Sequence, residues 1–295
     1  MKEIRIADIL AFLNEEGYCY EFSGDRSLIL KGFSSLKNYK EGTFTWAKNE
    51  KAYQNDLESK LFVIAQEGLS VAAHNVLYSE QSKKIFFDVI DHFYGENAQE
   101  KGIGQDTYIG PNVKLGKNVT IGHHCVLDGN IVIGDNTRIW NQVTMINRVD
   151  IGCNCEIQSG CVLGHDGFGW SEDEQHNRKM IKHYGGICIA DNVYIGPNTV
   201  VDRGTIDDTT IGEGSRIDAN CFIAHNVVIG KNAVLITGTR LYGSSCLGDN
   251  VYAASAMVRN QIKVEDNAML GMGCVVTKDV KTGAVVMGVP AREKE

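Results

Sequence analysis

One histidine has the residue type and setting for acid–base chemistry. His225 lies in the segment NCFIAHNVVIG, two residues after an aliphatic residue and directly before Asn226. An imidazole titrates near neutral pH, so it suits removal of a proton from an amine or hydroxyl group that attacks a thioester. The alternative is an ordinary surface or interface histidine, and both interpretations stay open at this point.

Four further histidines compete for a chemical role. They are His123 and His124 in IGHHC, His165 in GHDGFG and His183 in KHYGG. Three histidines from adjacent subunits could bind zinc, as in the hexapeptide-repeat carbonic anhydrases, because a catalytic zinc needs three converging ligands and an open position. No His-x-x-x-His pair supports this alternative. We therefore expect a site without a metal ion.

Charged residues cluster a short distance before the candidate base. The tripeptide Asp202-Arg203-Gly204 and the pair Asp207-Asp208 lie where a sequence repeat slips. Charged groups at such a break either bind substrate or cap a bulge through local hydrogen bonds. The sequence favours neither interpretation over the other.

The elements that position these residues follow from a six-residue repeat. From Ile103 to Leu163, an aliphatic residue or methionine occupies every sixth position, and glycine often follows it. A period of six fits neither an α-helix nor an array of hairpins, but it fits short strands joined by tight turns. The sequence therefore predicts a mainly β fold, a parallel β-helix with three hexads in each triangular coil.

The phase of the repeat also separates inward from outward side chains. The sixth-position residue points inward and stacks on its equivalent in the next coil, so a continuous apolar column forms. Cysteine occupies the position two residues earlier at Cys125, Cys155 and Cys161. We interpret these cysteines as interior packing groups rather than ligands.

The repeat is interrupted at two places that invite attention. It breaks after Leu163, resumes at Ile189, slips near Ile206 and then runs from Ile211 through Leu247. The first break holds HDGFGWSEDEQHNRKMIKHYGG, a polar stretch without the repeat. We expect this segment, about residues 165–187, to leave the β-helix as an excursion loop, and long loops on rigid scaffolds usually serve function.

Residues 1–100 lack the repeat and read as a small α+β domain, followed by the β-helix domain at 101–290. Apolar periodicity predicts a first helix over 4–14 and a last helix over 85–95. Short strands are expected around 28–33, 43–47 and 61–65. The chain is therefore expected to have two domains.

Composition limits the partners and the compartment. The formal net charge of −8 arises from 37 acidic and 29 basic residues without long runs, which argues against nucleic acid or an anionic membrane as a partner. The start MKEIRIADILAFLNEEG has no uninterrupted apolar stretch, so we expect no signal peptide, no transmembrane segment and a cytoplasmic protein. The nine cysteines show no four-ligand zinc spacing, which favours reduced thiols.

Three motifs carry a family resemblance. The segments GHDGFGW, NTVVDRGTIDDTTIG and RIDANCFIAHNVVIGKN resemble the UDP-3-O-acylglucosamine N-acyltransferases of lipid A biosynthesis. The resemblance implies a left-handed parallel β-helix and a homotrimer with active sites between subunits. It implies no bound cofactor, a 3-hydroxyacyl thioester on acyl carrier protein as donor, and the 2-amine of a UDP-linked glucosamine as acceptor.

The resemblance also implies a set of site residues. His225 is the general base, the main-chain amide of Gly243 stabilises the oxyanion, and Asp218 completes the catalytic set. The N-terminal domain binds uridine with Phe44 and Tyr53 as aromatic platforms, although Phe44 is equally compatible with the core of that domain. The remaining residues expected to contact substrate are His165, Asp166, Phe168, His183 and Asn226.

Some segments depart from the family pattern. The family usually has Asp-Asn-Gln where this chain has Asp218-Ala219-Asn220, and a second family histidine is replaced by Asn260-Gln261. The segment MGVPAREKE is typical of coenzyme A-dependent sugar acetyltransferases of the same fold. Two alternatives therefore remain. One is an N-acetyltransferase that uses acetyl-CoA or a short acyl-CoA on another nucleotide amino sugar for surface polysaccharide, and the other is a non-catalytic trimeric scaffold.

Overall fold

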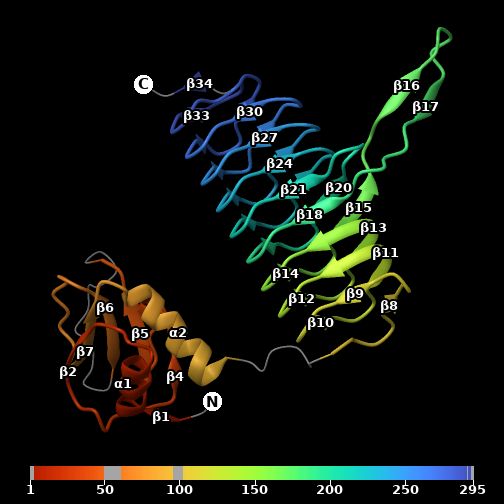
Figure 1. Cartoon of the computed structure of the whole chain (residues 1–295). Helices are drawn as coiled ribbons and strands as arrows, with labels where there is room; N and C mark the ends of the chain where they lie inside the picture. Colours follow the sequence, from red (N-terminus) through yellow and green to blue (C-terminus); the bar gives the residue numbers. More distant parts are fainter. Residues whose placement is uncertain (1–2, 50–60, 96–101, 291, 294–295) are drawn as a thin grey trace. The chain divides into compact units, whose positions relative to one another are not determined.

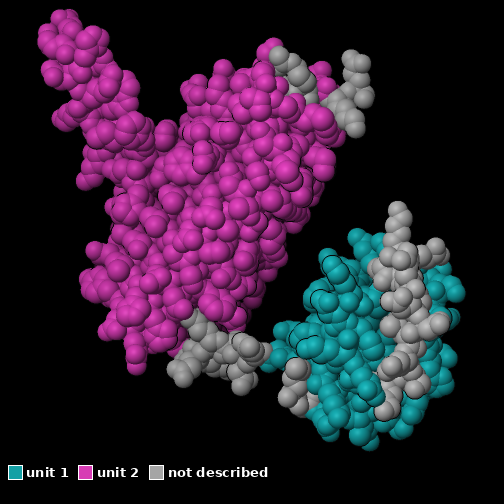
Figure 2. All heavy atoms as spheres, turned by 180° about the vertical axis from the view of Figure 1, so that it is seen from behind, with its two compact units in different colours: residues 1–98 teal, residues 99–295 magenta. Residues whose placement is uncertain are grey.

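The structure is a computed structural model that describes residues 3–49, 61–95, 102–290 and 292–293. The chain divides into two compact units, residues 1–98 and 99–295 (Figure 2). No helix in these described ranges is long and apolar enough to cross a membrane. Each unit has its own apolar core, so each is described by itself.

The first unit is a five-stranded sheet with two helices. The strand order is β2-β7-β6-β5-β4, in which β2 is antiparallel to its neighbour and the other pairs are parallel. The elements of this unit are β1 (Ile4–Arg5), α1 (Ile6–Glu15), β2 (Glu21–Ser23), β3 (Ile29–Leu30), β4 (Gly32–Phe33), η1 (Leu36–Asn38), β5 (Thr43–Ala47), β6 (Phe62–Gln66), β7 (Asn75–Ser79) and α2 (Ser82–Tyr94).

Apolar periodicity explains why the two helices pack as they do. Helix α1 buries Ile6, Ile9 and Leu13, and α2 buries Ile85 and Val89, so one stripe of each helix contributes to a shared core. The strand expected at 43–47 is present, and the one expected at 61–65 lies one residue later. The segment expected as one strand at 28–33 is two short strands.

The second unit is a triangular β-helix of parallel strands (Figure 1). Equivalent residues of successive coils pair 18 positions apart, as Arg138 does with Glu156, so one coil holds three hexads as the repeat predicts. One face is formed by β10 (Thr120–Ile121), β12 (Arg138–Ile139), β14 (Glu156–Ile157), β19 (Tyr194–Ile195), β22 (Arg216–Ile217), β25 (Val234–Leu235), β28 (Tyr252–Ala253), β31 (Met269–Leu270), β33 (Val285–Met287) and β34 (Arg292–Glu293).

The other two faces are joined because β11 (Val126–Ile133) and β13 (Thr144–Ile151) run through a corner. One row contains β8 (Tyr108–Ile109), β15 (Val162–Asp166), β20 (Val200–Arg203), β23 (Phe222–Ile223), β26 (Arg240–Leu241), β29 (Met257–Val258) and β32 (Val275–Val276). The other row contains β9 (Lys114–Leu115), β18 (Ile187–Ile189), β21 (Thr209–Ile211), β24 (Val228–Ile229), β27 (Cys246–Leu247) and β30 (Lys263–Val264).

The interior column is the one that the repeat predicts. Sixth-position residues from Ile121 to Leu163 and from Ile211 to Leu247 are at most 4% exposed. The cysteines expected inside, Cys125, Cys155 and Cys161, are buried, and all nine cysteines are free. Asparagine commonly occupies the corners with a positive φ, a conformation that asparagine tolerates better than most residues.

The interruptions of the repeat alter the column in different ways. After β15 the chain extends as a hairpin arm of β16 (Trp170–Glu172) and β17 (Arg178–Met180), which projects away from the β-helix (Figure 1). At the slip, Ile206 is 81% exposed and does not join the column. A second slip brings Val258 opposite Leu241, one residue short of a full coil.

Candidate active site

His225 lies at the corner between β23 and β24, next to the base of the arm. Its imidazole is half-buried, with Nδ1 3.1 Å from the side-chain oxygen Oδ1 of Asn226. That oxygen also accepts from the Thr205 main-chain amide at 3.1 Å, whereas Nδ2 of Asn226 donates to the Asp207 carbonyl at 3.0 Å. Because Oδ1 can only accept, Nδ1 of His225 carries the proton and Nε2 keeps its lone pair.

Two glycines make room for this imidazole. A Cβ atom at Gly167 would lie 2.7 Å from Cδ2 of the His225 ring, and a Cβ atom at Gly243 would lie 2.7 Å from Nε2. Real Cβ atoms do not approach other atoms so closely, so a larger residue at either position would displace the ring. The basic nitrogen of His225 therefore faces the main chain at Gly243.

The Gly243 amide is available to a ligand. Within the described residues it donates to no recorded acceptor, although the Gly243 carbonyl accepts from Gln261 at 3.0 Å. A main-chain amide beside a general base can stabilise an oxyanion that develops in the transition state. Gly243 lies beside Nε2 of His225, and its role as an oxyanion donor stays a prediction.

A second histidine packs against the first. The ring of His183 is fully buried and lies edge-on to the ring of His225, with 5.3 Å between centroids. Nδ1 of His183 is 2.9 Å from the Ile181 carbonyl, so this nitrogen donates, and Nε2 has no hydrogen-bond partner among the described residues. His183 thus supports the orientation of His225 rather than reaching the open pocket.

A pocket of about 450 Å³ opens beside His225. The aromatic rings of Phe168, Phe222 and Tyr242 contribute to its walls, together with Ala224 and Gly243. Phe168 projects from the base of the arm and is 79% exposed. The mixture of apolar walls and a few polar groups is typical of a small-molecule site.

The polar groups of the pocket come from four successive coils, which contain Asp202, His225, Ser244 and Arg259. Asp202 lies in β20, one residue before its end, and Arg259, Asn260 and Gln261 directly follow β29. Asp202 is 6% exposed, and burial, followed by the nearby Asp166 carboxylate, raises its pKa to about 7. From sequence, Asp202 was equally compatible with substrate binding and with capping of a bulge, and nothing in the sequence singled out Arg259. The signal for Asp202 was its place in the motif at the slip.

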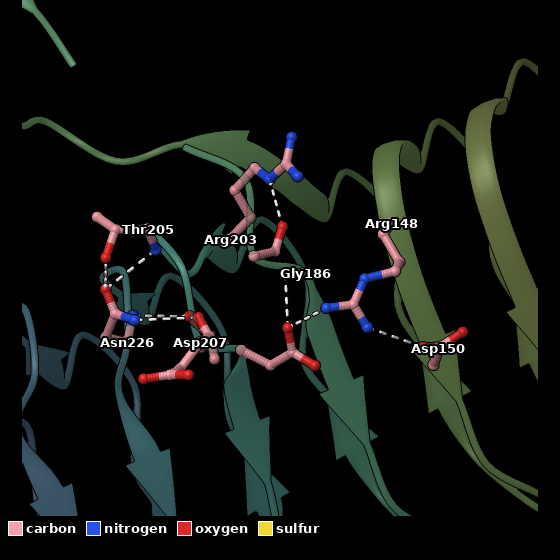
Figure 3. A network of polar contacts seen from close by, with 10 residues as sticks. Arg148, Asp150, Gly186, Arg203, Thr205, Asp207 and Asn226 are labelled. Carbon is pink, nitrogen blue, oxygen red and sulfur yellow. Dashed lines mark hydrogen bonds and ion pairs between the residues drawn. The ribbon is translucent and has the colours of Figure 1, made fainter. Parts of the chain in front are cut away.

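A network of polar contacts holds the slip in place (Figure 3). Asp208 accepts from the Gly186 amide at 2.8 Å and also pairs with the Arg148 guanidinium. Arg203 donates through Nε to the Gly185 carbonyl at 2.6 Å. The slip is thus tied both to the base of the arm and, through Asn226, to the corner that holds the candidate base.

The remaining expected contacts gather at the base of the arm. His165 and Asp166 are the last residues of β15. On the neighbouring strand β20, Asp202 lies opposite His165 and Arg203 lies opposite Asp166. Both side chains are exposed, and the Asp166 carboxylate accepts from the His183 amide at 3.3 Å. They therefore lie at the base of the arm, and neither lines the pocket described above.

Asp218 does not share the pocket of His225 within one chain. It lies on the other sheet, where its carboxylate accepts from the Ala219 amide at 2.7 Å and from the Thr237 amide at 3.1 Å. These bonds, with that from the Thr237 hydroxyl as the largest cause, lower the pKa of Asp218. It lines a separate apolar groove with Tyr194. Its observed role in this chain is to cap a corner, because local donors occupy its carboxylate.

The expected uridine platform also needs correction. Phe44 has no exposed surface and packs in the core of the first unit against Phe86 and Tyr94. A fully buried ring has no face on which a base can stack, so the core interpretation applies. Tyr53 lies outside the described residues.

In the described ranges, no three His, Cys, Asp or Glu side chains converge in a way that could hold a zinc ion. His123 and His124 lie at an exposed corner with 6.4 Å between ring centroids. Nδ1 of His123 accepts from the Gln105 amide at 2.8 Å. These two histidines are therefore part of a corner structure far along the sequence from His225.

Comparison with known families identifies the repeat. A family described as bacterial transferase hexapeptide (six repeats) matches residues 208–243, and one described as hexapeptide repeat of succinyl-transferase matches residues 102–141 and 254–278. The matched ranges cover both the coil of His225 and coils at each end of the β-helix. The repeat inferred from spacing alone is therefore confirmed as a hexapeptide repeat.

Curated relatives agree with the resemblance. The chain is 35% identical over 144 residues to UDP-3-O-acylglucosamine N-acyltransferase of Methylococcus capsulatus, which covers 48% of this chain and 41% of that protein. It is 38% identical over 148 residues to the protein of the same name from Methylobacterium nodulans, which covers 48% and 40%. The chain thus spans about two fifths of the length of the curated relatives it matches.

Solved structures support the architecture. A UDP-N-acetylglucosamine O-acyltransferase from Moraxella catarrhalis superposes with a TM-score of 0.61 at 22% identity, over 65% of this chain and 73% of that one. A UDP-N-acetylglucosamine acyltransferase from Francisella novicida gives a TM-score of 0.59 at 25% identity, over 65% and 68%. The fold is therefore a left-handed parallel β-helix, as expected.

Proposed function

We propose that this hexapeptide-repeat protein is an N-acyltransferase that moves an acyl group from a thioester to the amine of a UDP-linked amino sugar. The observation that carries the proposal is the arrangement at His225, where a basic Nε2 lies against Gly243, whose main-chain amide donates to no acceptor among the described residues. The names and similarity of the curated relatives support the same reaction.

The geometry suggests how the reaction proceeds. Nε2 of His225 accepts a proton from the amine as its nitrogen attacks the thioester carbonyl. The Gly243 amide stabilises the oxyanion of the tetrahedral intermediate, and the imidazolium then gives its proton to the departing sulfur. Asn226 accepts the hydrogen bond from Nδ1 throughout, so it keeps the correct nitrogen basic.

The finer features of the proposal follow the family resemblance. We propose a homotrimeric, cytoplasmic enzyme without a bound cofactor, whose donor is a 3-hydroxyacyl group on acyl carrier protein or on coenzyme A. The N-terminal unit would bind the nucleotide, although not through Phe44, because that ring is buried. The outward-facing pocket beside His225 is compatible with completion of the site by a neighbouring subunit.

A substrate panel tests this proposal. Purified full-length protein is incubated with several UDP-amino sugars, each paired with acetyl-CoA, hydroxyacyl-CoA or hydroxyacyl carrier protein, and products are identified by mass spectrometry. We expect an N-acylated UDP sugar with at least one thioester donor. Turnover with acetyl-CoA and not with the carrier protein would favour the acetyltransferase alternative, and no acyl transfer with any pair would contradict the proposal.

A further inference from the structure

The inference concerns Asp202, a buried carboxyl group in the wall of the His225 pocket. Only 6% of the residue is exposed, and it contributes to the same pocket as Phe168 and Gly243. Within the described part of the chain, no group donates a hydrogen bond to its carboxylate. A buried carboxylate without donors is costly, so its presence calls for a physical explanation.

The neighbouring cation does not supply that explanation. Arg203 follows directly in the chain, but its guanidinium donates to the Gly185 carbonyl at 2.6 Å and lies 3.9 Å from the Asp166 carboxylate. Arg203 is therefore engaged at the base of the arm. Asp202 instead faces the open pocket, where a ligand bearing a positive charge or a hydrogen-bond donor would satisfy it.

The chemistry of an amine acceptor requires two proton transfers. An alkylamine near an electron-withdrawing group has a pKa of about 8, like an α-amino group, so at neutral pH it arrives mainly as ammonium. One proton must leave before the nitrogen has a lone pair, and a second must leave as the amide forms. His225 can hold only one of these protons until it protonates the leaving sulfur.

We propose that Asp202 is a second base, which accepts the first proton of the acceptor's ammonium group and leaves His225 free for the second. This inference rests on the proposed function, because it needs an amine acceptor. It assigns to Asp202 a catalytic contact with the reacting nitrogen. It also explains why a carboxyl group without protein donors is retained in an otherwise largely apolar wall.

The steps balance without another reactant. The ammonium group and the Asp202 carboxylate give a neutral amine and a carboxylic acid. The amine attacks the thioester, the carbon–nitrogen bond forms and the carbon–sulfur bond breaks. His225 takes the second proton from nitrogen and gives it to sulfur, and Asp202 returns the first proton to water. The products are an amide, a thiol and one released proton.

The surroundings of Asp202 suit a group that changes its protonation state near neutral pH. Burial is the main cause that raises its pKa to about 7, and the Asp166 carboxylate on β15 adds to it. Other titratable or charged groups are His165, which pairs with Asp202 from β15, and His225, Tyr242 and Arg259, which line the same pocket. A carboxylate with this pKa is basic enough to take a proton from ammonium and acidic enough to release it.

The test compares pH profiles of kcat/KM for the wild type and Asp202→Asn with a UDP-amino sugar and an active donor. The amide has the shape of the carboxyl group but cannot accept the proton as a base. We expect a deficit of about 10-fold at pH 6, where about a tenth of Asp202 is ionised and about a hundredth of the amine is neutral. The deficit should shrink to less than about 2-fold at pH 9, because most of the amine is then neutral before it binds. The control is Asp128→Asn, which changes an exposed aspartate on β11 and should match the wild type at every pH.

Each outcome separates the proposal from its alternatives. A deficit that is the same at every pH, or no deficit, would overturn the second-base role while leaving the proposed function intact. Wild-type protein that forms no N-acyl product would contradict both. Asp202→Glu retains a base, so its deficit should not depend on pH. If circular dichroism shows that Asp202→Asn does not fold, the test rests on Asp202→Glu alone. A deficit of Asp202→Glu that grows as the pH falls, as expected for loss of a base, would then contradict the proposal.

Discussion

The coils from Ile211 to Leu247 are held together differently from the segment between Leu163 and Ile211. In the regular coils, each strand pairs with its equivalent one coil away, and the inward residue is at most 2% exposed. In the irregular segment, the chain leaves as an arm and slips at Ile206. Side-chain contacts such as that between Arg148 and Asp208 then replace part of the regular ladder (Figure 3).

The difference shows where a repeat protein can place chemistry. A filled column leaves no interior cavity, so a pocket must arise where the coil is interrupted. The pocket of His225 combines groups from the base of the arm, from the strand before the slip and from the next regular coils. The regular coils supply rigidity, and the irregular segment supplies the shape and charge of the site.

The largest expected effect is the loss of activity on removal of the His225 imidazole. His225→Ala removes the proposed base and should lower kcat by about 10²–10⁴-fold, the usual contribution of general acid–base catalysis. Because the imidazole is half-buried at a corner, the β-helix should keep its circular dichroism spectrum. Steady-state kinetics measure the loss, and an unchanged kcat would assign the site elsewhere or support a non-catalytic scaffold.

Shortening a side chain in the apolar column should destabilise the protein more than shortening one at the slip. Ile217→Ala opens a cavity in a regular coil and should cost about 2–5 kcal/mol of unfolding free energy, because Ile217 has no exposed surface. Ile206→Ala at the slip should change stability by no more than about 0.5 kcal/mol, because that side chain is 81% exposed. Denaturant unfolding measures both, and equal losses would refute the distinction between column and slip.

A smaller effect should follow from crowding the imidazole. Gly167→Ala places a Cβ atom 2.7 Å from the His225 ring and should reduce kcat/KM by about 10–100-fold through misplacement of the base. The matched control is Gly169→Ala, whose Cβ atom would have ordinary contacts of 3.5 Å and longer. If both variants lose activity equally, the loss reflects the loop as a whole rather than the position of the ring.

The smallest expected difference lies between two asparagines with positive φ. Asn226→Ala removes the bonds to Thr205 and Asp207 that hold the slip, whereas Asn232→Ala changes a regular corner with a similar φ of 53°. We expect Asn226→Ala to be less stable than Asn232→Ala by about 1–2 kcal/mol, the range for hydrogen bonds that leave buried groups without partners. Hydrogen exchange at residues 204–208 should also increase only in Asn226→Ala.

The sequence predicted the fold correctly wherever every sixth side chain is buried in the β-helix column. The column, the inward cysteines and the excursion after Leu163 follow directly from spacing. The polar network at the slip does not follow from spacing, because Arg148 and Asp208 meet only after the chain has passed through two coils and the arm. The pattern also did not decide whether Phe44 lies in a core or on a surface, because an aromatic residue in a short strand suits both positions.

Charge at the site was the hardest feature to predict. Asp202 and Asp218 are both aspartates near strand ends, but the first is buried without donors and the second is surrounded by them. Consequently the pKa of Asp202 is raised to about 7, whereas the pKa of Asp218 is lowered. Such a contrast depends on neighbours from other coils, which sequence spacing alone does not specify.

The central claim is that the pocket of His225 transfers an acyl group to nitrogen. Its most direct test is a single-turnover reaction with an isotope-labelled acyl thioester and a UDP-amino sugar, followed by tandem mass spectrometry of the product. We expect wild-type protein to place the label on the sugar amine and His225→Asn to leave it on the donor. Labelled oxygen esters, or equal transfer to nitrogen by the variant, would contradict it.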